Sequence, residues 1–132
     1  FLIRPALAAG KWVICDRFAD STRVYQGVSG NLPAEVVLTL EHHVVGATHP
    51  DLTLILDAPV SLAFERRAAR AGLADVFEQR GDGFHESVRQ AFAEIARREP
   101  ERCRIVDASR AAPEVAAMAW LHVSQLLAEA AS

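Results

Sequence analysis

The chain has 132 residues, of which 51% are apolar, and its formal net charge is −3. This length and apolar content suffice for a buried core, so we expect a single domain over residues 1–132. The acidic balance argues against a general surface for nucleic acid or anionic membranes, while a local basic patch stays compatible with it. No apolar run approaches the ~18 residues that a membrane-spanning helix needs.

The chain begins with an expected helix and an expected strand. Residues 1–9 are apolar apart from Arg4 and end at Gly10, a frequent kind of helix stop. Residues 12–15, Trp-Val-Ile-Cys, form a short apolar run that ends at Asp16. Short runs of this kind are typical of parallel strands that are covered on both faces.

Two further strands alternate with helices along the rest of the chain. The runs at 52–56 and 104–106 repeat the strand pattern and end at Asp57 and Asp107. Helical spacing of apolar residues predicts helices over 36–45, capped from Asn31, and over 60–71, 84–95 and 115–127. Strands that alternate with helices predict an α/β fold with a parallel sheet flanked by helices.

The helix over 84–95 has two distinct faces. Its apolar face is expected to hold Phe84, Val88, Ala91, Phe92 and Ile95, and its outer face His85, Glu86, Arg89, Glu94 and Arg97. The core of the sheet would then lie against the first of these faces.

The two cysteines lie far apart in apolar, strand-like segments. Cys15 and Cys103 have no CxxC or Cys/His spacing around them, so we expect buried, reduced thiols in a cytoplasmic protein. The five histidines likewise lack metal-ligand spacing.

Asp16-Arg17-Phe18 stands where the first expected strand opens into a loop. Open α/β sheets bind ligands at that edge, and arginine holds phosphate oxygens through two parallel hydrogen bonds. The motif therefore indicates a phosphorylated ligand, and an Asp-Arg turn that caps the next helix is the competing interpretation. In that helix Thr22, Tyr25 and Gln26 share one turn, where they would meet a base or sugar unless Tyr25 faces the core.

Three arginines lie within one turn of the helix that begins near residue 60. Arg66, Arg67 and Arg70 share a face, and Gly72 follows. Such a cluster beside a hinge can fold over a polyphosphate, whereas a solvated basic face near a helix C-terminus is the alternative. Residues 75–79 follow, and there Glu78 could cap the next helix or bind a sugar hydroxyl.

In chain order, these motifs resemble the bacterial thymidylate kinases. The match runs through Pro5-Ala6-Leu7, Gly10, Asp16-Arg17-Phe18, Ser21-Thr22, Tyr25-Gln26-Gly27, Pro50-Asp51-Leu52-Thr53, Leu56-Asp57, the arginine helix, Phe77-Glu78-Gln79 and Ile105-Val106-Asp107-Ala108-Ser109. The resemblance implies a three-layer P-loop nucleoside monophosphate kinase that moves the γ-phosphate of ATP to dTMP with Mg²⁺, giving dTDP and ADP. It also implies a homodimer, with the helix over 36–45 as the candidate contact.

The resemblance assigns roles to particular residues. Arg17 would hold phosphate between donor and acceptor, and Asp16 would stand near Mg²⁺ and the substrate phosphate. Arg66 and Arg70 would be lid arginines that close over ATP, within a lid at about 66–79. The remaining assignments are thymidine contacts at Thr22, Tyr25 and Gln26, the deoxyribose pocket at Phe77 with Asp75 and Glu78, and the adenine loop at Ala108 and Ser109.

The chain departs from the family pattern at several places. Val76 stands where many relatives carry another lid arginine, and Gly27-Val28-Ser29-Gly30 replaces a more glycine-rich run. Gly10-Lys11 is no P-loop, because the earlier glycine and the hydroxyl residue are missing and a strand follows it instead of preceding it. The P-loop and the first two strands of the family fold would lie upstream of Phe1. We therefore expect residues 1–132 alone neither to fold natively nor to catalyse, because ladder groups in the sheet would lack partners.

Two other functions remain open on these motifs. A deoxynucleoside kinase of related fold also carries Asp-Arg after a strand, and it would phosphorylate thymidine instead of dTMP. A non-catalytic nucleotide-binding remnant would lack the donor site.

Overall fold

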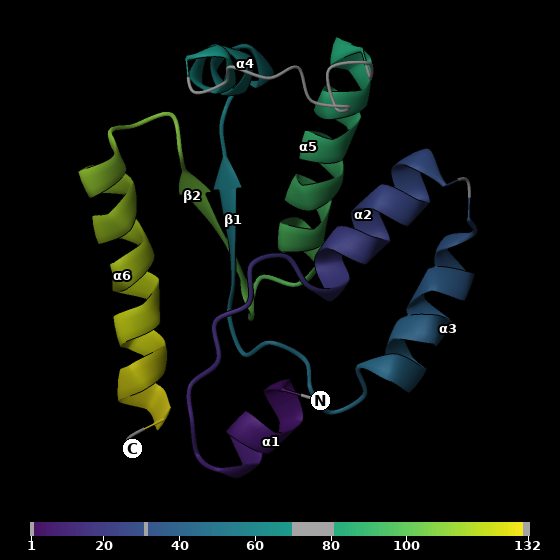
Figure 1. The fold of residues 1–132 in the computed structure, drawn as a ribbon, viewed down its shortest axis with the longest axis vertical. Helices are drawn as coiled ribbons and strands as arrows, with labels where there is room; N and C mark the ends of the chain where they lie inside the picture. The colour runs from purple at the N-terminus through teal and green to yellow at the C-terminus, as the bar shows by residue number, and fades with distance from the viewer. Residues whose placement is uncertain (1, 31, 70–80, 131–132) are drawn as a thin grey trace. The chain divides into compact units, whose positions relative to one another are not determined.

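The computed structural model describes residues 2–30, 32–69 and 81–130. The chain forms two compact units, Phe1–His49 and Pro50–Ser132 (Figure 1). Among the described residues, no helix is both long enough and apolar enough to cross a membrane.

The first unit contains three helices, α1 (Ile3–Ala8), α2 (Ala19–Ser29) and α3 (Ala34–Val44). Helices α2 and α3 pack together, and their contact buries Val24 and Val37, which are 1% and 5% exposed. Burying an aliphatic side chain of this size contributes about 1.5–3 kcal/mol. The predicted helix over 36–45 is confirmed, although it begins at Ala34 after Pro33; Asn31, its expected cap, lies outside the described residues.

A buried ion pair links the same two helices. Arg23 donates from Nε and Nη2 to the two carboxylate oxygens of Glu41, at 2.5 and 2.6 Å, and the Glu41 side chain is only 7% exposed. His49 Nε2 lies 3.5 Å from the same carboxylate. A forked guanidinium on a carboxylate supplies the partners that a buried charge requires.

The expected stop of the first helix is confirmed. Helix α1 ends at Ala8, and Gly10 then adopts a φ of 70°. This left-handed conformation is open to glycine without a Cβ clash, so the chain turns there.

The prediction of a strand over residues 12–15 is wrong. The segment has no regular secondary structure, and Ile14 and Trp12 are 100% and 61% exposed. Cys15 is exposed as well, which corrects the expectation of a buried thiol there. An apolar run becomes a strand only when a neighbouring strand accepts its ladder hydrogen bonds, and no described segment pairs with it.

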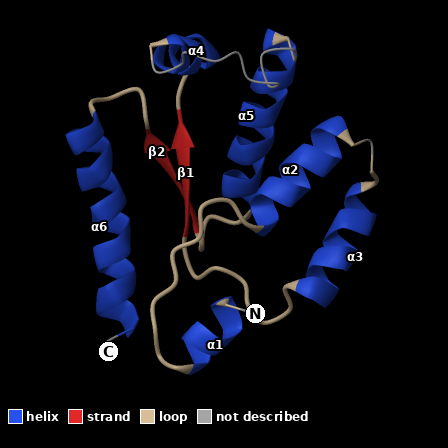
Figure 2. Ribbon diagram, viewed as in Figure 1, coloured by secondary structure: helices blue, strands red, loops and turns tan. Residues whose placement is uncertain are grey.

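The second unit is built on two parallel strands, β1 (Thr53–Asp57) and β2 (Cys103–Asp107). Their register pairs Thr53 with Cys103 and Asp57 with Asp107, so both strands end at the same level. Helix α4 (Val60–Ala68) follows β1, and α5 (Asp82–Arg98) and α6 (Ala112–Ala130) flank the strands on opposite sides (Figures 1 and 2). The predicted parallel sheet between helices is thereby confirmed.

The core of this unit lies between the strands and α5. Ile55, Ala96 and Cys103 are buried, and Phe92 and Ile95 pack against them. Cys103 is 3% exposed and is a free thiol, as expected. The apolar face expected for α5 is therefore the face that covers the sheet.

Candidate functional site

The Asp16-Arg17 turn of the first unit has a strained backbone. Arg17 has a φ of 65°, and it is the only non-glycine residue with a positive φ among those described. Such a conformation costs on the order of 1–3 kcal/mol and is concentrated at functional sites. Both Asp16 and Arg17 are exposed, so the turn presents a carboxylate and a guanidinium to solvent.

Helix α2 begins directly after this turn and places a tyrosine against the arginine. The Arg17 guanidinium lies 4.7 Å from the centroid of the Tyr25 ring, a cation–π contact. Tyr25 is half-buried, whereas Thr22 and Gln26 are exposed on the same helix. The structure thus brings Arg17 and Tyr25 together. Thr22 and Gln26, the other two residues predicted to contact a base or sugar, are exposed to solvent.

The chemistry of Asp16 fits a hydrated magnesium ion. Mg²⁺ is commonly held by one or two carboxylates together with substrate phosphates, and Asp16 supplies one exposed carboxylate. The described residues contain no cluster of three or more His, Cys, Asp or Glu side chains suited to a metal. A cation at this turn would therefore take most of its ligands from phosphate oxygens and water.

In the second unit, the turn after β2 is closed by the carboxylate of Asp107. Its Oδ1 accepts hydrogen bonds from the backbone N–H of Ser109, at 3.0 Å, and from the Ser109 hydroxyl. Its Oδ2 accepts from Arg110 Nε at 3.1 Å. The Ser109 hydrogen bonds, and then Arg110, lower the pKa of Asp107 below its ordinary value of 3.8. Asp107 therefore closes this turn with its own side chain, as aspartates that follow a strand commonly do.

Arg66 reaches this turn from helix α4. Its Nη1 donates to the carbonyl of Ala108, and its Nη2 donates to the carbonyls of Ser109 and Arg110 at 2.9 and 3.1 Å. The backbone N–H of Ala108 donates to the carbonyl of Asp57 at 2.7 Å. Three of the residues assigned to ATP, namely Arg66, Ala108 and Ser109, therefore form one hydrogen-bonded cluster.

Asp57 binds Arg89 across the unit. Arg89 Nε and Nη2 donate to Oδ1 and Oδ2 of Asp57 at 2.7 and 2.9 Å. Hydrogen bonding from Arg89 lowers the pKa of Asp57, against a smaller opposing effect of burial, and the same pair raises the pKa of Arg89. Arg89 was expected on the outer face of α5, and this contact corrects that expectation. Because 32 residues separate the pair, no local sequence signal indicated it.

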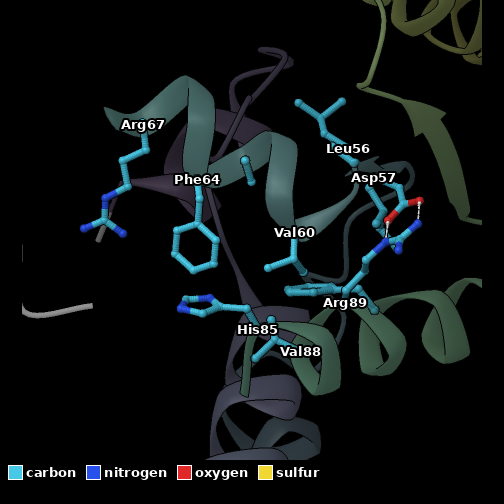
Figure 3. A pocket seen from close by; sticks show the side chains of 12 residues that line it. Leu56, Asp57, Val60, Phe64, Arg67, His85, Val88 and Arg89 are labelled. Atoms are coloured by element: carbon cyan, nitrogen blue, oxygen red, sulfur yellow. Dashed lines mark hydrogen bonds and ion pairs between the residues drawn. The ribbon is translucent and has the colours of Figure 1, made fainter. Parts of the chain in front are cut away.

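A cavity of about 280 Å³ lies between the end of β1 and helices α4 and α5 (Figure 3). The Asp57–Arg89 pair stands on one side of it, and the Phe64 and His85 rings meet edge to face on another, with centroids 5.0 Å apart. The lining is otherwise mostly aliphatic and aromatic, with Arg67 at its margin. His85 was expected outside; instead it lines the cavity.

Several residues with predicted roles lie outside the described part of the chain. They are Arg70, Asp75, Val76, Phe77 and Glu78. The proposed deoxyribose pocket and most of the lid therefore stay predictions.

Comparison with known proteins covers both units. A family model described as thymidylate kinase matches residues 2–119. The chain belongs to the thymidylate kinase family. A thymidylate kinase of Caulobacter vibrioides is 55% identical over 107 residues, which is 81% of this chain and 51% of that protein. Those of Afipia carboxidovorans and Nitrobacter winogradskyi are 46% and 47% identical and cover 98% and 99% of this chain.

A solved thymidylate kinase supports the fold. The crystal structure of the Ehrlichia chaffeensis protein matches 80% of this chain and 47% of its own, with a TM-score of 0.57 and 32% identity. The chain spans 51%, 58% and 59% of the length of these three curated relatives. The resemblance to thymidylate kinases and the α/β fold implied by it are thus confirmed, and the two-stranded parallel sheet flanked by helices is consistent with an incomplete form of that fold.

Proposed function

We propose that the protein containing this chain is a thymidylate kinase that transfers the γ-phosphate of ATP to dTMP, with Mg²⁺. A phosphate oxygen of dTMP forms the new bond to the γ-phosphorus, the bond to ADP breaks, and dTDP and ADP leave. The observation that carries the proposal is the family match over residues 2–119. The exposed, strained Asp16-Arg17 turn within that match supports it.

Arg17 is proposed to bind the transferring phosphoryl group and the phosphate of dTMP. An arginine in this role stabilises the charge that spreads over the phosphoryl oxygens and contributes about 10³–10⁵ in rate. The contact with the Tyr25 ring orients the guanidinium before substrate binds. Thr22, Tyr25 and Gln26 are proposed to contact thymidine, since they line the helix that begins at the same turn.

When bound, Mg²⁺ would neutralise charge on the phosphates, and Asp16 is the residue proposed to hold it, through water. Ala108 and Ser109 are proposed to contact the adenine of ATP, and Arg66 and Arg70 to belong to the ATP lid at about 66–79. Asp75, Phe77 and Glu78 are proposed for the deoxyribose pocket. A single domain over 1–132, a homodimer and a cytoplasmic location complete the proposal.

Product analysis tests this function. The protein expressed from its complete gene is incubated with ATP, Mg²⁺ and either dTMP or thymidine, and the nucleotides are separated by chromatography. Formation of dTDP from dTMP, with no dTMP formed from thymidine, is the expected result. Phosphorylation of thymidine would instead indicate a deoxynucleoside kinase, and binding without turnover would indicate a non-catalytic nucleotide-binding protein.

A further inference from the structure

One guanidinium holds three consecutive carbonyls of the turn after β2. Arg66 donates to Ala108, Ser109 and Arg110, which are 42 to 44 residues away in sequence. Carbonyl oxygens that point toward one place repel each other through their partial charges, unless a cation lies between them. Arg66 supplies that cation, and its planar fork reaches all three.

Two other contacts close the same turn. Asp107 binds the backbone N–H and hydroxyl of Ser109, and the Ala108 N–H is bound by the carbonyl of Asp57. The main-chain polar groups of Ala108 and Ser109 are therefore already bound within the unit. What remains for a ligand is a preformed surface that carries the Ala108 methyl group and the exposed Ser109.

We propose that Arg66 is a positioning residue for ATP, which sets the shape of the Ala108–Arg110 turn instead of binding phosphate. The inference rests on the proposed function, because it takes that turn as the contact for adenine. Because Arg66 already holds the turn in place, ATP does not have to order it on binding, and less binding free energy is lost. Losing Arg66 would then weaken ATP binding and leave the chemical step unchanged.

Steady-state kinetics separate positioning from phosphate binding. In the protein from the complete gene, Arg66→Gln is expected to raise KM for ATP about tenfold, which corresponds to ordering about one backbone residue. The value of kcat at saturating ATP is expected to change by less than about threefold. A fall in kcat of about 10³-fold with KM for ATP unchanged would assign Arg66 to the phosphates and overturn the proposal.

The conservative variant Arg66→Lys distinguishes geometry from charge. Lysine keeps the positive charge but has a single point-like ammonium that cannot span three carbonyls as the fork does. We expect KM for ATP to rise nearly as much as in Arg66→Gln. Full recovery with lysine would show that only the charge matters, and it would overturn the proposal. The matched control is Arg98→Gln, which removes an arginine that is 71% exposed and binds Glu94 on the same helix.

Amide hydrogen exchange tests the same idea without any turnover. The Ser109 N–H of the nucleotide-free protein should exchange faster in Arg66→Gln than in wild type, while amides of β1 keep their protection. Unchanged exchange at Ser109 would overturn the proposal, even if the enzyme is active. Conversely, the wild-type protein could make no dTDP while the Ser109 N–H still exchanges faster in Arg66→Gln. That result would support the Arg66 contact and refute the proposed function.

Discussion

Two turns that read alike in the sequence differ sharply in the structure. Asp16-Arg17 and Asp107–Arg110 both follow apolar runs and both combine an aspartate with an arginine. The second turn is closed by its own carboxylate and by Arg66. The first has a strained Arg17 with a guanidinium that rests on the Tyr25 ring and stays exposed. We infer that the second turn, whose polar groups are bound within the fold, serves as a rigid surface. The first turn keeps an exposed guanidinium that can bind a ligand.

Removing the exposed charge of Arg17 should have the largest effect on activity. Arg17→Gln keeps a side chain of similar length at the same positive φ, and it removes the guanidinium. We expect kcat in the dTMP reaction to fall at least about 10³-fold, while the free energy of unfolding changes by no more than about 1 kcal/mol, the value of an exposed cation–π contact. Lys11→Gln removes a neighbouring exposed charge and serves as the control. If the free energy of unfolding of Arg17→Gln fell far enough to account for the loss of activity, Arg17 would be a structural residue.

The buried Arg23–Glu41 ion pair stabilises the unit that carries the Arg17 turn. Glu41→Gln removes the carboxylate that the Arg23 fork binds and leaves Asp20, 3.8 Å from Arg23 Nη1, as a charged neighbour. Breaking a buried ion pair typically costs 3–5 kcal/mol, and we expect the low end of that range because Asp20 remains. We expect a drop of about 3 kcal/mol in the free energy of unfolding, measured by urea denaturation monitored by circular dichroism. A change below about 1 kcal/mol would show that Asp20 or water offsets the lost charge of Glu41.

Acid should weaken the second unit through Asp57. Arg89 lowers the pKa of Asp57 below its ordinary 3.8, so the folded state favours the ionised carboxylate. This contribution to stability is present above pH 3.8 and is lost as the pH falls through the lowered pKa. Thermal unfolding followed from pH 6 to pH 2 should therefore show a steeper loss for wild type than for Asp57→Asn. Parallel curves would show that the pair adds nothing to stability.

The smallest effect is expected on the outer face of α5. Arg97 and Arg98 both bind Glu94, and their hydrogen bonds lower its pKa to about 2, but their side chains are 73% and 71% exposed. Water competes for such groups and salt screens them. Glu94→Gln should thus shift the melting temperature less than Asp57→Asn does, and the shift should vanish in 1 M salt. A shift that persists in salt would indicate a contact of another kind.

The sequence predicted the helices and the two paired strands well because their signals are local. Apolar periodicity identifies the face of α5 that covers the sheet, and Gly10 marks the end of α1. The run at residues 12–15 carried the same strand signal and was misleading, because a strand also needs a partner. Local patterns measure how well a segment suits a strand, but they do not supply the neighbour.

The site was predictable in part. Spacing placed Thr22, Tyr25 and Gln26 on one helix after Asp16-Arg17, and the structure adds the contact between Tyr25 and Arg17. The long-range contacts were beyond sequence reasoning. Arg66 with the carbonyls after β2 and Arg89 with Asp57 join residues 32 to 44 positions apart. Nothing in the local composition distinguishes these arginines from solvated ones.

By itself, the sequence determined the family of this chain, its helices and the two strands that pair, and it singled out residues whose chemistry suits phosphate and nucleoside. Those properties depend on residue type and spacing, which the chain carries locally. Only the tertiary structure decided which charged side chains form hydrogen bonds within the fold and which are exposed to solvent. The Arg66 and Arg89 guanidiniums are bound within the fold, and Arg17 is left facing solvent. That division depends on which segments pack together, because a hydrogen bond between distant residues exists only once the fold has brought them within reach.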